Sequence, residues 1–171
     1  MKKTISFYKI LWMMPLICLM NASQGQDKKT AQTAQIKSWI DSSNFIFIPQ
    51  VAMPMRGGTR QLMGDFELIV SKDTLVSYLP YFGRAYNVDP ASTQSPFDFV
   101  STNFDYTVTA KKKGGWDIII KIKGTGEAIT YSLSISSNGY GSLITTSNSR
   151  DPISFSGSVA ERKRKQQRPS K

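Results

Sequence analysis

The feature that most constrains the fold is an alternation of apolar and polar side chains in the second half of the chain, in which only Ile119 is an apolar residue at a polar position. It runs through residues 104–110, 116–123 and 129–136, and a period of two places every second side chain on one face of a β-strand. The pair Asn138-Gly139 follows, which is the strongest short signal for a tight hairpin turn. Strands with one apolar and one polar face predict an antiparallel sheet that covers a core on one side only.

The register of two of these strands follows from their short connection. Residues 111–115 join them, and pairing Ala110 with Trp116 places Asp105 opposite Lys121 on the solvent face. A slip of one residue would expose the apolar set, so the register is strongly constrained.

The first half of the domain predicts one helix followed by shorter strands. Residues 27–42 contain good helix formers, with Asp27 as a candidate N-cap and with Ile36, Trp39 and Ile40 at helical spacing. We expect this helix to pack against the sheet, because its apolar stripe is short.

Further strands are predicted over residues 45–48, 66–71, 75–79, 142–146 and 153–159, and residues 83–97 form one long loop. Residues 45–48 are apolar at every position, which is typical of a strand covered on both faces. Together these runs predict about eight or nine strands in an antiparallel meander. We expect a mainly β fold with one N-terminal helix, in which the meander forms a curled sheet or barrel; a two-layer β-sandwich is the alternative.

Residues 1–25 have the pattern of a cleavable signal peptide. Three lysines precede the apolar run Ile10–Met20, and small and polar residues follow it. The run is shorter than a bilayer requires, although a membrane anchor is an alternative. We expect cleavage near Gly25, loss of the only cysteine, Cys18, no transmembrane segment in the mature chain, and a periplasmic or cell-surface location.

The formal charge of +10 lies mainly at the two ends of the chain. Residues 26–159 hold 13 basic against 11 acidic residues, whereas residues 160–171 hold six basic residues and one acidic residue. Such a run is typical of a disordered, solvated tail, so the single domain is predicted to span residues 26–159. Nucleic-acid binding is not expected, because it requires a basic face on the domain itself.

The composition excludes several kinds of active site. The chain has no histidine, and its one cysteine lies in the expected signal peptide. Histidine-dependent acid–base catalysis, Ser-His triads and zinc sites with nitrogen or sulfur ligands are therefore excluded. The carboxylates of Asp65 and Glu67 share a strand face but are expected to point into solvent. We predict no catalytic residue, no metal and no cofactor.

The densest aromatic cluster lies beside the long loop. The candidate ligand-binding residues are Tyr78, Tyr81, Phe82, Arg84 and Tyr86, because aromatic rings and a guanidinium bind ligands by stacking and cation–π contact. The guanidinium of Arg84 is also suited to a carboxylate or phosphate. In the alternative interpretation the aromatics cap the core and Arg84 bonds to loop carbonyls.

Three segments resemble a known family. They are residues 77–86 (SYLPYFGRAY), 113–116 (KGGW) and 138–157 (NGYGSLITTSNSRDPISFSG). Together they resemble domain of unknown function 4251, a family of small exported proteins of Bacteroidota, over residues 27–159. The resemblance implies export and a bacterial source, and it implies no activity or site residue.

These observations favour an exported, non-catalytic protein that binds a small molecule or a component of the bacterial envelope. One alternative is a hydrolase or lyase that uses only Asp, Glu, Tyr and Arg, for which converging buried carboxylates would argue. The other is a purely structural envelope protein, for which a packed interior would argue.

Overall fold

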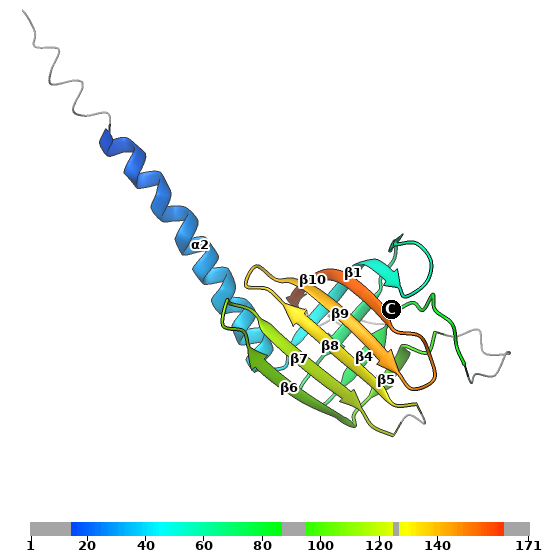
Figure 1. The fold of residues 1–171 in the computed structure, drawn as a ribbon. Helices are drawn as coiled ribbons and strands as arrows, with labels where there is room; N and C mark the ends of the chain where they lie inside the picture. The colour runs from blue at the N-terminus through cyan, green and yellow to red at the C-terminus, as the bar shows by residue number, and fades with distance from the viewer. Residues whose placement is uncertain (1–14, 87–94, 125–126, 163–171) are drawn as a thin grey trace, which may run out of the picture.

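The computed structural model describes residues 15–86, 95–124 and 127–162 of the chain. One helix, α2 (Pro15–Asp41), leads into an antiparallel, nearly closed barrel (Figure 1). The strands are β1 (Phe45–Pro54), β2 (Arg60–Gln61), β3 (Glu67–Val70), β4 (Leu75–Tyr78), β5 (Asp98–Ser101), β6 (Phe104–Ala110), β7 (Trp116–Ile122), β8 (Ile129–Ile135), β9 (Tyr140–Ser147) and β10 (Ile153–Glu161). The mainly β fold with one helix and the barrel are therefore confirmed.

The strand order shows how the sheet closes. Neighbours run β5-β4-β3-β1-β10-β9-β8-β7-β6, and β2 pairs only with β1. Because each pairing is antiparallel, β5 and β6 at the two edges run in the same direction. Only Thr102 and Asn103 separate them. The two edges are thus halves of one bent strand, and the nine strands of this path form a barrel of eight.

The bend between β5 and β6 is held by local hydrogen bonds. The Ser101 hydroxyl donates to the Asn103 carbonyl and accepts from the Asn103 amide, both at 3.2 Å. The Lys123 amide donates to the same carbonyl at 3.0 Å. The backbone amide and carbonyl of Asn103, which leave the ladder here, are therefore both hydrogen-bonded.

Strand β1 departs from the predicted meander. It pairs with β3 on one side and with β10, the last strand, on the other, over nine residue pairs from Phe45↔Glu161 to Pro54↔Ile153. The last strand therefore includes Ala160 and Glu161, which the sequence had suggested belong to the tail. Residues 163–171 of that predicted tail lie outside the described residues.

Large side chains fill the barrel interior, as expected for eight strands, which leave room for side chains alone. The largest fully buried ones are Tyr131, Phe45, Phe47, Phe97, Phe155, Ile36, Ile40, Leu68, Leu75, Leu79, Ile118 and Ile120. The pairing of Asp105 with Lys121 confirms the predicted register. Strand β1 is covered on one face only, since Ile48 is 40% exposed, so the prediction of a doubly covered strand was wrong.

Helix α2 covers one end of the barrel. Ile36 and Ile40 are 2% and 1% exposed, and the Tyr106 hydroxyl of β6 donates to the Ile40 carbonyl at 3.1 Å. The helix ends where predicted but begins at Pro15, so Asp27 lies inside it and is not an N-cap. In the part of the chain that the structure describes, no helix is both long and apolar enough to cross a membrane.

The turn between β6 and β7 allows a matched pair of substitutions. Gly114 and Gly115 both have positive φ angles, of 88° and 95°. A Cβ on Gly115 would lie 2.3 Å from the Ile135 carbonyl oxygen, whereas one on Gly114 would meet nothing closer than 4.0 Å. We expect Gly114→Ala to lower the free energy of unfolding by about 1–2 kcal/mol and Gly115→Ala by about 3 kcal/mol or more. Urea denaturation measures both, and equal losses would contradict the close approach.

The contact between α2 and β6 predicts a dependence of stability on alkaline pH. Burial raises the pKa of Tyr106 to about 12, while the unfolded phenol ionises near its ordinary pKa of 10. Between these values the unfolded state binds fewer protons than the folded state, so the free energy of unfolding falls as pH rises. Urea denaturation from pH 9 to 11 should show that the free energy of unfolding falls less steeply with pH in Tyr106→Phe than in the unsubstituted protein. The exposed Tyr140 supplies the control Tyr140→Phe, and an equal change there would refute the assignment.

Candidate functional site

The end of the barrel opposite α2 is closed by residues 79–86, which we call the rim segment. Its backbone pairs with the β9–β10 connection through a bridge between Ala85 and Arg150. The Tyr86 amide donates to the Ser149 carbonyl at 2.9 Å, and the Asp151 amide donates to the Arg84 carbonyl at 3.0 Å. Segments far apart in the sequence thus form one cap over the open end.

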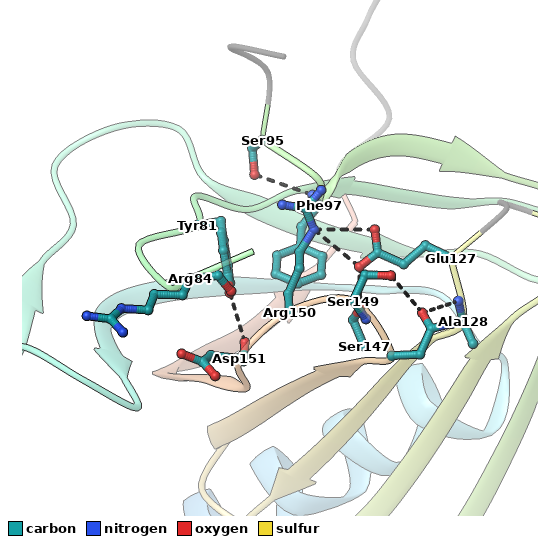
Figure 2. A network of polar contacts seen from close by, with 11 residues as sticks. Tyr81, Arg84, Ser95, Phe97, Glu127, Ala128, Ser147, Ser149, Arg150 and Asp151 are labelled. Carbon is teal, nitrogen blue, oxygen red and sulfur yellow. Dashed lines mark hydrogen bonds and ion pairs between the residues drawn. The ribbon is translucent and has the colours of Figure 1, made fainter. Parts of the chain in front are cut away.

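The side chain of Tyr81 fixes the turn in the rim segment. Its hydroxyl lies 2.7 Å from the Arg84 carbonyl and 3.1 Å from the Asp151 carbonyl, and it donates to both (Figure 2). A Cβ on Gly83 would lie 2.4 Å from this hydroxyl. Glycine at position 83 therefore leaves room for the Tyr81 hydroxyl. We call this hydroxyl and its two carbonyl partners the Tyr81 clamp.

A largely buried ion pair lies beside this clamp. Arg150 Nε is 3.2 Å and 3.3 Å from the two carboxylate oxygens of Glu127, and the two side chains are only 12% and 19% exposed (Figure 2). The Ser147 hydroxyl also donates to Glu127. The Arg150 guanidinium carbon stands 5.6 Å from the centre of the Tyr81 ring, within the range of a cation–π contact.

An aromatic column continues from this pair into the barrel. The rings of Tyr81 and Phe97 meet edge-on at 5.4 Å, and those of Phe97 and Tyr131 at 6.3 Å. At its base the Ser77 hydroxyl donates to the Phe97 carbonyl at 2.7 Å and lies 2.9 Å from the Tyr131 hydroxyl. Burial raises the pKa of Tyr131, so the column is a neutral, packed part of the core.

Asp151 is a second buried carboxylate beside the rim segment, after Glu127. It is 5% exposed and accepts a hydrogen bond from the Tyr86 hydroxyl, which raises the pKa of Tyr86. Burial, with the Asp151 charge second, raises the pKa of Tyr81. The charges of Arg56 and Arg84 act on Tyr86 in the opposite direction and offset part of this rise in its pKa.

The five predicted site residues do not form one patch. Tyr81 and Tyr86 meet at Asp151, while Phe82 packs under the guanidinium of Arg60 at 4.6 Å. The ring of Tyr78 is 45% exposed and stacks on Phe66 at 5.4 Å. The Arg84 side chain is exposed and extends away from the Arg150–Glu127 pair (Figure 2).

Glu127, Arg150 and Asp151 were not among the predicted site residues. The only signal for them was the position of Arg150-Asp151 between two predicted strands, inside a segment that carries the family resemblance. Both carboxylates are held by partners in the structure. Within residues 15–86, 95–124 and 127–162, no three His, Cys, Asp or Glu side chains are grouped as a metal site requires.

Comparison with known proteins identifies a family over most of the domain. Residues 27–159 match the family model described as Domain of unknown function (DUF4251). Among solved structures, the crystal structure of a DUF4251 family protein from Bacteroides eggerthii is similar, with a TM-score of 0.55 and 14% identity over 77% of this chain and 88% of that one. At this identity the likeness supports the fold alone. A comparison with curated proteins finds no match.

The structure indicates that the Glu127–Arg150 pair holds the rim segment in place. We expect Glu127→Gln or Arg150→Met to lower the free energy of unfolding by about 3 kcal/mol, because each removes the opposite charge of a largely buried ion pair. The double variant should lose little more free energy of unfolding than either single variant does. The matched control is the exposed pair Asp105 and Lys123, whose removal should cost at most about 1 kcal/mol. Urea denaturation of the three variants completes the cycle, and additive losses would show that the two side chains do not interact.

Proposed function

The chain belongs to the DUF4251 family, and we propose that it is an exported, non-catalytic binding protein of the bacterial envelope that takes an anionic group at its rim. The observation that carries this proposal is the exposed guanidinium of Arg84, which extends into solvent away from the Arg150–Glu127 pair (Figure 2). The charge of the exposed Arg56 also acts on Tyr86, beside Arg84. A carboxylate or phosphate on a small molecule or an envelope component is the matching ligand, because a guanidinium binds either group through two parallel hydrogen bonds.

The charges around Tyr86 support an anionic ligand. Arg84 and Arg56 are exposed, and neither forms an ion pair with another described residue. The nearby carboxylate of Asp151 is buried and accepts from Tyr86. The two arginines therefore present positive charge to solvent that no described residue neutralises.

The rigidity of the rim segment supports the same proposal. The Arg84 carbonyl accepts from Tyr81 at 2.7 Å and from the Asp151 amide at 3.0 Å. These bonds fix the backbone from which the Arg84 side chain extends. A binding residue on a loop that a rigid barrel holds in place loses less entropy on binding.

A purely structural role is the second candidate, and the filled barrel interior favours it. The interior aromatics Tyr131, Phe97 and Phe155 are fully buried, so any ligand must bind to the outer surface. An enzyme has less support, because Glu127 is paired with Arg150 and Asp151 with Tyr86.

A titration with inorganic phosphate at constant ionic strength separates binding from a structural role. We expect saturable shifts in the amide resonances of residues 84–86, and weakening of about tenfold in Arg84→Ala and in Arg56→Ala. Lys72→Ala is the control, because Lys72 is an exposed cation in the turn at the α2 end of the barrel. Equal shifts with chloride, or unchanged phosphate binding in Arg84→Ala, would remove the anion site and leave the structural role.

A further inference from the structure

A second surface lies at the opposite end of the barrel, where α2 crosses the β8–β9 turn. A groove of about 530 Å³ runs between them and reaches Gln50 in the middle of β1 and Ser158 and Val159 of β10. It is lined by Gln32, Gln35, Ile36, Trp39, Gln50, Asn138, Gly139, Tyr140, Ser158 and Val159. This volume is typical of a small-molecule site, and none of the rim residues contributes to it.

The groove lining has a distinctive chemistry. It combines two aromatic rings, Trp39 and Tyr140, with four side-chain amides and no charged group. An amide both donates and accepts hydrogen bonds, which matches hydroxyl groups, since they do the same. A flat aromatic ring matches the C–H face of a sugar ring. A charged ligand would find no counter-charge among these residues.

The walls of the groove are held in place before any ligand binds. Gln32 Nε2 donates to the Asn138 carbonyl at 3.2 Å, and the Thr33 hydroxyl donates to the Ser137 carbonyl at 3.1 Å. Gly139 packs so closely on Ile36 that a Cβ would lie 3.3 Å from its Cδ1. A preformed site avoids the entropy cost of ordering loops on binding.

Several side chains of the groove make no hydrogen bond within the described part of the chain. Tyr140 is 64% exposed although it begins a strand. The side-chain amides of Gln35 and Gln50 make no hydrogen bond to any residue in the described part of the chain. These three side chains therefore leave their hydrogen-bonding groups free for a ligand.

A second hollow of about 320 Å³ adjoins the groove. It shares Gln32 and Asn138 with the groove and continues past Ser136 and Ser137 to Lys29. Among the described residues, Lys29 is the only charged one that lines either of the two hollows, and it lines only the second one. We propose that this groove, between α2 and the β8–β9 turn, binds a neutral oligosaccharide, with Trp39 and Tyr140 stacking on sugar rings and the amides bonding to hydroxyl groups.

A glycan array that carries neutral and acidic oligosaccharides, followed by calorimetry with the retained glycan, tests this proposal on the purified protein. We expect a neutral glycan to bind, and Tyr140→Ala and Gln50→Ala each to weaken it by about tenfold. Both substitutions are at exposed positions, so the melting temperature should change little. Val100→Ala, which removes a 65% exposed apolar side chain on β5, is the matched control and should bind normally.

Three outcomes would overturn the proposal. The first is an array that retains no neutral glycan. The second is binding of a neutral glycan that Tyr140→Ala leaves unchanged. The third is binding of peptides, and not of glycans, in the groove. The phosphate titration at the rim uses different residues at the other end of the barrel. A negative result in one of the two experiments therefore does not contradict the proposal that the other experiment tests.

Discussion

The pairing of β1 with β10 is the interaction on which the rest of the structure depends. The strands β3 to β5 and β6 to β10 form two meanders, and in the strand order of the sheet only β1 lies between them. Strand β1 joins them by pairing with both β3 and β10, and it places Phe45 and Phe47 in the core. The approach is close enough that a Cβ on Gly157 would lie 2.1 Å from the Ile48 carbonyl oxygen. A bulky side chain at position 157 is therefore incompatible with this closure.

Barrel closure decides where the protein can bind a ligand. Side chains fill the interior, α2 covers one end with Ile36 and Ile40, and the rim segment covers the other with Tyr81. The surfaces beside these two caps differ in chemistry. The rim segment presents the exposed Arg84, whereas the groove at α2 presents amides and two aromatic rings. The segments that carry the family resemblance contain the Tyr81 clamp, Gly115 and Arg150, so much of the resemblance concerns how the barrel is closed.

The sequence predicted the local part of this fold well and the non-local part poorly. Alternation and short turns were enough for the pairing of β6 with β7 and for the Asn138-Gly139 turn, because both depend on neighbouring residues. The β1–β10 pairing joins residues more than 90 positions apart, and no local pattern encodes it. The β5–β6 bend lacks glycine and proline, the usual turn signals. The predicted site shows the same limit. Residues 78–86 do include the rim segment, but the buried guanidinium that packs beside this segment is that of Arg150. Its partner, Glu127, is 23 residues away in the sequence.

The central claim is that β1 and β10 hold the barrel together as one cooperative unit. Native-state hydrogen exchange measured for single amides tests this claim most directly. We expect the paired amides of β1 and β10 to exchange only through global unfolding, with the same free energy as the amides of β7 and β8. The contrary result is exchange of the β1 and β10 amides through a partial opening of lower free energy, with β7 and β8 still protected. That result would show that the β6–β9 meander is stable without barrel closure.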